Sequence, residues 1–101
     1  MKLWFSNLNF LSEWHELEFF GGCYNTIEDI TGLKDKSKLR EIYLYQNNIT
    51  DISVMNTLET LFCLDIEKNN ISDLAPLRNL PNLEYLLIGE NHITDISPLA
   101  T

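Results

Sequence analysis

Positive charge is scarce in this chain of 101 residues, which has seven lysines and arginines against fifteen aspartates and glutamates. The formal net charge is −8. Nucleic acid binding depends on clustered cations that displace counterions from phosphates, and anionic lipid surfaces likewise attract cationic faces. We therefore expect neither nucleic acid nor a membrane among the partners of this protein.

Cysteine and long apolar runs are also scarce. Two cysteines do not make a disulfide framework, and no window approaches the ~20 apolar residues of a membrane span. The apolar N-terminal run 1–11 is interrupted by Ser6, Asn7 and Asn9 and lacks the cleavage site of a signal peptide. We expect a cytoplasmic protein, unless a leader has been removed from the sequence.

The chain has only two histidines, and their positions argue against catalysis. The two histidines, His15 and His92, share no predicted strand face with a cysteine, serine or acid at a suitable spacing. A nucleophile needs a base within hydrogen-bond reach. The sequence therefore predicts that the protein is not an enzyme, and it indicates no cofactor.

Leucine and isoleucine are abundant, and they recur every 22 residues. They supply 27 of the 101 residues. Seven positions, six of them apolar and one asparagine, repeat four times without insertion or deletion. Only Gly22 departs from this pattern, where the other repeats have leucine or isoleucine. The first position of each copy is Leu17, Leu39, Leu61 and Leu83. Such a strict period is the signature of a repeat array.

The period divides the chain into repeats at 17–38, 39–60, 61–82 and 83–101, the last of them incomplete and without a C-terminal cap. Residues 1–16 continue the frame backward but lack the strand and the asparagine, so we expect a degenerate N-terminal cap or half repeat. Terminal repeats are atypical because their outer layer has no neighbour. Trp4 or Trp14 is expected to cover the open end of the core. All of these parts form one domain.

Within each repeat, a strand is followed by a tight turn. The segment 42–45 alternates inward apolar and outward aromatic residues, as a half-buried strand must. Short polar residues and, in two repeats, proline then predict one helical turn. The aspartates at the start of each turn are expected to cap it, and not to bind calcium, because no loop of about six oxygen ligands surrounds them. They are Asp29, Asp51, Asp73 and Asp95.

The pattern L-x-x-L-x-L-x-x-N-x-I-x-x-I-x-x-L resembles the leucine-rich repeat family, in the 22-residue class of bacterial internalins. The phrases 49–53 and 93–99 are typical of that class. The resemblance implies an α/β-type solenoid, mainly β with 3₁₀ turns: a right-handed superhelix of about four and a half repeats with a parallel concave sheet. It also implies a protein-binding role and a ladder of buried amide side chains, formed by Asn25, Asn47, Asn69 and Asn91.

The outward positions of the predicted sheet hold all four tyrosines and both cysteines. Strand preference alone does not explain this, because the inward strand positions hold no tyrosine. Tyrosine is enriched at the centres of interfaces, and the accompanying acids favour a partner with a basic contact surface. The candidate protein-binding residues are Phe19, Tyr24, Glu41, Tyr43, Tyr45, Asp65, Glu67, Tyr85, Leu87 and Glu90.

Two further expectations follow from the register. Cys23 and Cys63 fall two strands apart and four residues out of line, about 16 Å, beyond the ~7 Å limit between Cα atoms for a disulfide. They should be free thiols, which suits a reducing compartment. The lysine-rich run 34–38 predicts a solvated convex loop, with Lys36 in it.

The last repeat has no following layer in the sequence, which stops soon after Leu99. We expect either that a second copy covers this end, giving a homodimer, or that the sequence is cut from a longer array. The candidate self-association edge consists of Leu83, Leu86, Ile88, Ile93, Ile96 and Leu99.

The leading interpretation is a non-enzymatic module that binds a protein partner through an acidic, tyrosine-rich concave sheet. Three alternatives stay open: a small inhibitor or immunity-type protein that blocks a basic site of a toxin or other enzyme, a fragment of an internalin-like surface protein, and a structural solenoid that uses this face for self-association. The sequence names no partner.

Overall fold

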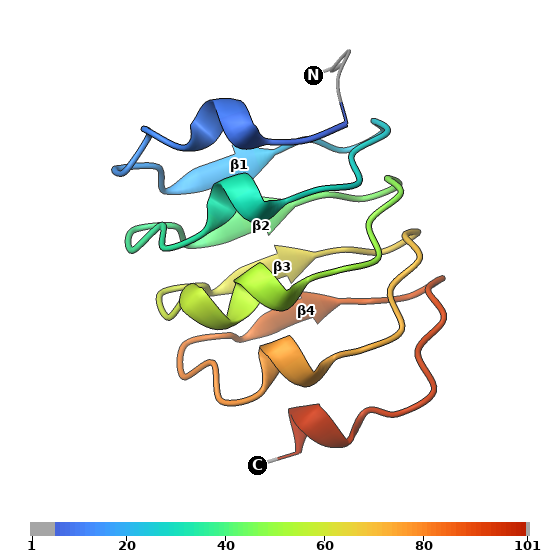
Figure 1. The fold of residues 1–101 in the computed structure, drawn as a ribbon. Coiled ribbons are helices and arrows are strands. Elements are labelled where there is room, and N and C mark those ends of the chain that lie inside the picture. Colours follow the sequence, from blue (N-terminus) through green and yellow to red (C-terminus); the bar gives the residue numbers. More distant parts are fainter. Residues whose placement is uncertain (1–5, 101) are drawn as a thin grey trace.

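One parallel sheet runs along one side of the molecule (Figure 1). The computed structural model describes residues 6–100. Phe20 pairs with Ile42 and Ile42 with Leu64, so neighbouring strands are aligned at the 22-residue period. The predicted leucine-rich solenoid is confirmed. The four strands, which lie side by side in chain order, are β1 (Phe19–Gly21), β2 (Glu41–Tyr43), β3 (Cys63–Asp65) and β4 (Tyr85–Leu87).

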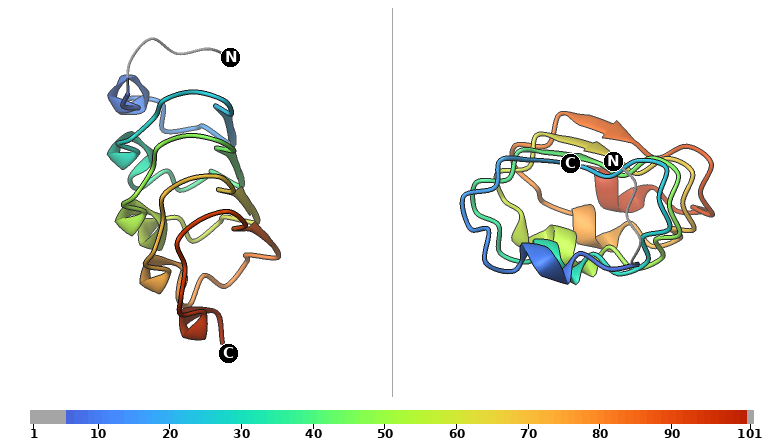
Figure 2. Two further views of the ribbon diagram at one scale, coloured as in Figure 1. Left: turned by 90° about the vertical axis from the view of Figure 1, so that its right-hand side faces the viewer. Right: turned by 90° about the horizontal axis from the view of Figure 1, so that it is seen from above.

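Short 3₁₀ turns form the side of the solenoid opposite the sheet. Figure 2 shows them stacked one above another, each joined to a strand by extended chain. Proline occupies the first turn of η4 and η5, where its missing N–H has no partner to lose. The turns are η1 (Asn9–Leu11), η2 (Thr31–Leu33), η3 (Ser53–Thr57), η4 (Ala75–Leu77) and η5 (Ser97–Leu99).

An aspartate two residues before each of the last four turns caps it, as the sequence predicted. In η3, Oδ1 of Asp51 accepts the backbone N–H of Ser53 at 2.8 Å. The backbone donors lower the pKa of the carboxyl groups of Asp29, Asp51 and Asp95, because they stabilise the charged form. The equivalent bonds elsewhere are made by Asp29, Asp73 and Asp95.

Leucine and isoleucine side chains fill the space between the sheet and the turns. Ile42 and Leu64, at the centres of their strands, are fully buried. Burial decreases toward the C-terminal end, where Leu86 and Ile88 are only half-buried, because residues 6–100 supply no further layer beyond them. Each layer is therefore stabilised mainly by its neighbours.

The asparagine after each strand joins two successive repeats. The Asn69 amide nitrogen donates to the carbonyls of Leu44 and Ile66, both at 3.0 Å. Its Oδ1 accepts the backbone N–H of Ile49 at 3.1 Å. Asn47 and Asn91 repeat this set of bonds, and the Asn25 amide donates to carbonyls of its own repeat. The amides thereby satisfy buried backbone groups that have no partner within the sheet.

The N-terminal segment 6–16 extends the solenoid with a turn but no strand. Its buried layer consists of Leu8 and Leu11, which are fully enclosed. The prediction that Trp14 covers the core is wrong: its side chain is 55% exposed, and its ring meets the edge of Phe10 at a centroid distance of 6.2 Å. The short cap leaves the indole on the surface because the two leucines already fill the layer. Trp4, the other predicted cover, lies outside the described residues.

Lys36 is buried, so its predicted place in a solvated loop is also wrong. Its side chain is 2% exposed, and Nζ donates to the backbone carbonyl of Ser12 at 3.2 Å. Lys36 stands at a leucine position of the period, equivalent to Leu58 and Leu80. Its aliphatic stem fills the leucine site while the ammonium group reaches a carbonyl.

Both cysteines, Cys23 and Cys63, are free and half-buried, as their predicted separation required. Within residues 6–100, no helix has the length and apolar character needed to cross a membrane.

Gly32 allows η2 to lie against the preceding backbone. A Cβ atom at this position would overlap the carbonyl group of Leu8. Backbone cannot move aside as a flexible side chain can, so this contact requires glycine. At Gly21, in contrast, an added Cβ would meet only the ring of Phe19, at 3.3 Å.

Gly32→Ala is expected to lower the free energy of unfolding by about 2–4 kcal/mol, because the methyl group forces η1 and η2 apart. Urea denaturation followed by circular dichroism measures the change. Gly21→Ala is the matched control and should cost much less. Equal stabilities for the two variants would contradict the close approach at Gly32.

Asn69→Ala is expected to lower the free energy of unfolding by about 3 kcal/mol, since it leaves a buried N–H and two carbonyls without this partner. Asn91→Ala should cost less, because Asn91 is only half-buried. The same denaturation experiment compares the two. A larger loss at Asn91 would contradict the expectation that these bonds stabilise more where they are more deeply buried.

Candidate functional site

The ten candidate protein-binding residues all lie on the outer side of the sheet or at the ends of its strands, and we call them the outer sheet face. They alternate with buried residues such as Phe20 and Ile42. Phe19, Tyr24 and Tyr85 are between 55% and 58% exposed. Leu87 and Glu90 are also exposed. The half-buried members are Glu41, Tyr43, Tyr45, Asp65 and Glu67.

Aromatic rings on this face contact one another across neighbouring repeats. Phe19 and Tyr43 have ring centroids 5.4 Å apart, and Tyr24 and Tyr45 are 5.2 Å apart. These spacings are typical of favourable ring pairs. The pairs hold large apolar surfaces in place while leaving them accessible.

A third ring pair includes a residue that the sequence did not single out. The ring centroids of Phe62 and Tyr85 are 5.2 Å apart, and the Arg40 guanidinium carbon is 5.1 Å from the Phe62 ring centroid. Phe62 and Arg40 directly follow the first leucine of their repeats, one position before the outward set. Arg40 and Phe62 occupy the same position of the 22-residue period. That shared position could have identified them in the sequence as an extension of the outer sheet face beyond the strands.

A hollow of 580 Å³ lies beside this third pair, where the strands begin. Two cations, Lys38 and Arg40, line it together with Phe62. Lys38 is already paired with Glu16 at 3.2 Å, and Glu84 also lines the hollow. The other lining residues are Ser37, Thr60 and Asn82. This hollow could not be predicted from the sequence, since its walls come from three different loops.

The hydroxyl group of Tyr43 is held by its neighbours. It donates to Oε1 of Glu41 at 2.7 Å. Hydrogen bonding to Cys63 and to Glu41, together with their negative charge at high pH, raises the pKa of Tyr43 well above its ordinary value of 10.0. The phenol therefore stays protonated and keeps the O–H that it donates to Glu41.

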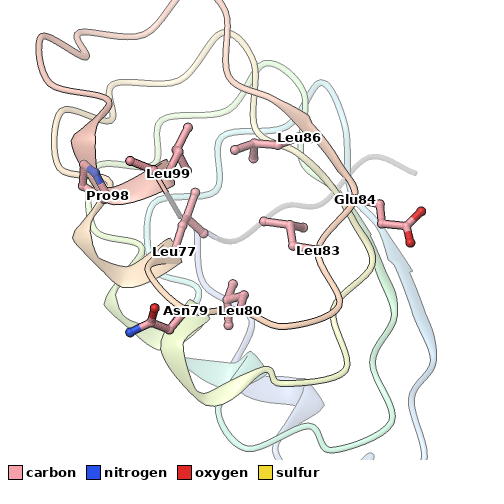
Figure 3. Close-up of a pocket in the computed structure, with 9 residues that line it drawn as sticks. Leu77, Asn79, Leu80, Leu83, Glu84, Leu86, Pro98 and Leu99 are labelled. Carbon is pink, nitrogen blue, oxygen red and sulfur yellow. The ribbon is translucent and has the colours of Figure 1, made fainter.

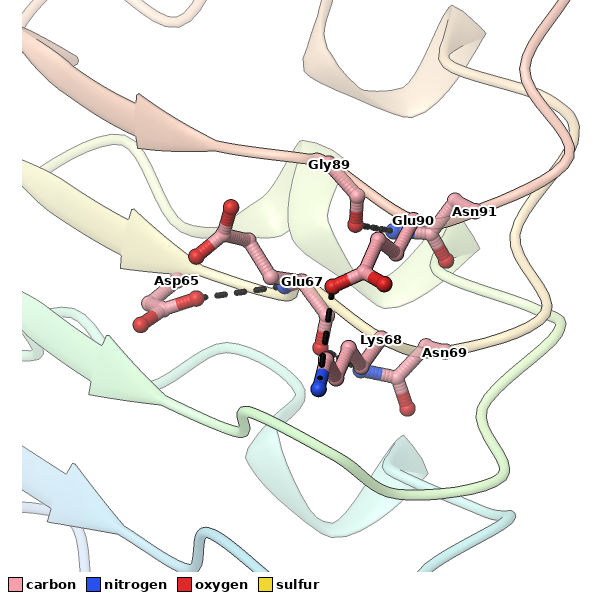
Figure 4. A network of polar contacts seen from close by, with 7 residues as sticks. All are labelled: Asp65, Glu67, Lys68, Asn69, Gly89, Glu90 and Asn91. Carbon is pink, nitrogen blue, oxygen red and sulfur yellow. Dashed lines mark hydrogen bonds and ion pairs between the residues drawn. The ribbon is translucent and has the colours of Figure 1, made fainter.

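Acidic side chains gather over the last two repeats, as Figure 4 shows. Oδ1 of Asp65 accepts the backbone N–H of Glu67 at 3.1 Å. The Glu67 carboxylate extends over Gly89, since a Cβ there would lie 2.9 Å from its Oε2. Nζ of Lys68 lies 3.7 Å from Oε2 of Glu90. We call Asp65, Glu67 and Glu90 the acidic patch.

Residues 6–100 hold no group of three or more histidine, cysteine, aspartate or glutamate side chains arranged to bind a metal ion. His15 lies 3.6 Å from Glu13 at the exposed surface of the cap. The geometry of the outer sheet face is suited to contact with another molecule.

Comparison with known proteins agrees with the observed fold. A family model described as leucine-rich repeats (two copies) matches residues 58–101. An internalin, InlF, from Listeria monocytogenes is 38% identical, with a TM-score of 0.85 over 92% of this chain. Internalin C2 from the same species is 31% identical, with a TM-score of 0.91 over 93% of this chain. A search of curated protein sequences gives no significant match.

The chain has a leucine-rich repeat fold and is similar to part of two internalins. It spans only 28% and 42% of the length of the two internalin structures. The resemblance therefore concerns part of those proteins, and the likeness to internalins that the 22-residue pattern predicted is confirmed.

The C-terminal end of this leucine-rich repeat chain leaves part of its core accessible. A hollow of 240 Å³ opens there between η5 and β4 (Figure 3). Leu83, Leu86 and Leu99 line it and are half-buried. Of the other residues predicted for this edge, Ile88 and Ile93 are half-buried, whereas Ile96 is 66% exposed.

Replacing either acceptor near Tyr43 is expected to bring its pKa back toward about 10. Cys63→Ala removes the main cause of the raised value, and Glu41→Gln removes the second. The ionisation of the phenol is followed by ultraviolet absorbance or by NMR of the tyrosine ring. Tyr43→Phe, which removes this phenol, identifies its signal. Tyr85→Phe, which removes a different phenol, should leave the pKa of Tyr43 unchanged. An unchanged titration in both acceptor variants would contradict the hydrogen bonds.

Proposed function

We propose that the chain is a non-enzymatic module that binds a protein partner through the outer sheet face. The observation that carries this proposal is the set of accessible aromatic rings, paired across repeats and presented by a regular sheet. Rings of this kind offer contact area at low entropic cost, because they are already held in place. Tyr43, Tyr45 and Tyr85, with Phe19 and Leu87, form the centre of the proposed contact.

The charges around this centre support a partner with a basic contact surface. Glu41 and the acidic patch lie beside the rings, and the whole chain carries a net charge of −8. Such a field accelerates the approach of a basic partner and disfavours an acidic one. A small inhibitor that blocks a basic site of a toxin or another enzyme would use the same face.

The dimensions of the molecule limit the contact. Its principal extents are 34 × 26 × 18 Å, and a standard interface buries roughly 800 Å² on each partner. The partner would therefore have to reach beyond the strands. The hollow next to Phe62 and Arg40 is the adjoining surface that supports such an extension.

A second setting is favoured by the comparisons. The 38% identity to an internalin over most of this chain supports a place in a longer, internalin-like surface protein. The half-buried leucines at the C-terminal end would then contact a further repeat. Two free cysteines fit the cytoplasm better. The protein-binding proposal rests on the outer sheet face and holds in either setting.

Tyr85→Ala and Tyr43→Ala are each expected to reduce partner binding at least tenfold, the loss typical of a residue at the centre of an interface. Melting temperatures should change little, because both rings project outward. Partners from the native host are captured on the immobilised chain, identified, and then titrated against each variant.

Phe10→Ala is the matched control, since it removes a ring that is 41% exposed on η1, away from the sheet. It should leave binding unchanged. A partner that binds both tyrosine variants as tightly as the original chain would overturn the proposal. Unfolding of both variants would show instead that these rings belong to the core.

A further inference from the structure

One row of side chains crosses all four repeats at the ends of the strands. The rings of Tyr24 and Tyr45 have centroids 5.2 Å apart. Nζ of Lys68 lies 5.5 Å from the centre of the Tyr45 ring and 3.7 Å from Oε2 of Glu90. The row therefore runs from two aromatic rings through a cation to an acid.

The surroundings of the Lys68 ammonium group have the composition of a cation-binding site. The face of a tyrosine ring attracts positive charge, and the Glu90 carboxylate supplies the opposite charge. Hydrogen bonding to Tyr45 and the charge of Glu90 raise the pKa of Lys68, so these surroundings favour the charged ammonium.

Lys68 is the one cation on the outer side of the sheet within residues 6–100, apart from those at the ends where the strands begin. It neutralises part of a face that would otherwise present only acids. Its side chain is 39% exposed and that of Glu90 is 70% exposed. Ion pairs this accessible are weak, so solvent or another cation can replace Lys68.

We infer that Lys68 occupies, within the molecule, a subsite for a basic side chain of the partner, and that an arginine of the partner displaces it from Tyr45 and Glu90. Arginine suits the subsite better than lysine, because its planar guanidinium can stack on the ring and donate two parallel hydrogen bonds to a carboxylate. This inference rests on the proposed function and deepens it, since it names the group that the acidic end of the outer sheet face recognises.

Displacement has a measurable consequence. A partner that must expel Lys68 binds only the fraction of molecules in which the subsite is open. Lys68→Gln keeps a long polar side chain but removes the competing charge. It is therefore expected to tighten binding of a basic ligand by about three- to tenfold.

The probe is an acetylated and amidated tri-arginine peptide, titrated at low salt and followed by the backbone amide NMR signals of the full chain. Lys34→Gln is the matched control, because it removes the same charge from an exposed position after η2, away from the sheet. It should tighten binding far less than Lys68→Gln. Tri-lysine should bind more weakly than tri-arginine to the Lys68→Gln variant.

Two further variants identify the walls of the subsite. Glu90→Gln should weaken tri-arginine binding several-fold, whereas Glu84→Gln, which removes an exposed acid where β4 begins, should have a smaller effect. Tyr45→Leu introduced together with Lys68→Gln should abolish the gain from Lys68→Gln alone. Melting curves of each variant check that the fold is retained, and Glu90→Gln tests the subsite even if Tyr45→Leu is unstable.

The outcomes separate this inference from the proposed function. Equal tightening by Lys68→Gln and Lys34→Gln, with the peptide still mapping to the outer sheet face, would overturn the subsite alone and leave a general electrostatic attraction. A peptide that perturbs only amides away from this face would overturn the subsite and the expected basic partner, whereas the Tyr43 and Tyr85 variants decide the proposed function separately. Selective tightening that depends on Tyr45 and Glu90 would establish the subsite.

Discussion

The amide side chain after each strand is the interaction on which the rest of the structure depends. Asn69 bonds to backbone of its own repeat and of the preceding one, and Asn47 does the same one layer earlier. Without these bonds, the buried loops that leave the sheet would hold unpaired polar groups, at a cost of about 1–3 kcal/mol each. The apolar layers can therefore stack at a constant spacing because the turns between them are satisfied internally.

That constant spacing converts positions in the sequence into positions on a surface. Adjacent strands lie about 4.8 Å apart, so side chains 22 residues apart become neighbours. Phe19 and Tyr43 can touch, although 24 positions separate them in the chain. The row from Tyr24 to Glu90 arises in the same way, from one residue in each repeat. Binding groups are thus supplied by separate repeats but held by one sheet.

Much of this arrangement could be predicted from the period alone. The strand register, the aspartate caps and the outward tyrosines all follow from which residues recur every 22 positions. Lys36 and Trp14 could not be placed, because each substitutes for leucine at the same point of the period and only the neighbouring layers decide whether the side chain is enclosed. Lys36 has a stem that fits the core and a carbonyl within reach, whereas the indole of Trp14 stays outside.

The sequence by itself determined the repeat, its register and the side of the sheet on which each side chain lies, because these depend on local alternation and on identical neighbours. Only the tertiary structure decided which outward groups meet: Phe62 with Tyr85, Arg40 over Phe62, and Lys68 between Tyr45 and Glu90. Such contacts depend on side-chain directions across strands and on loops of different repeats. A periodic pattern does not contain this information, since it fixes where a side chain starts but not where its end lies.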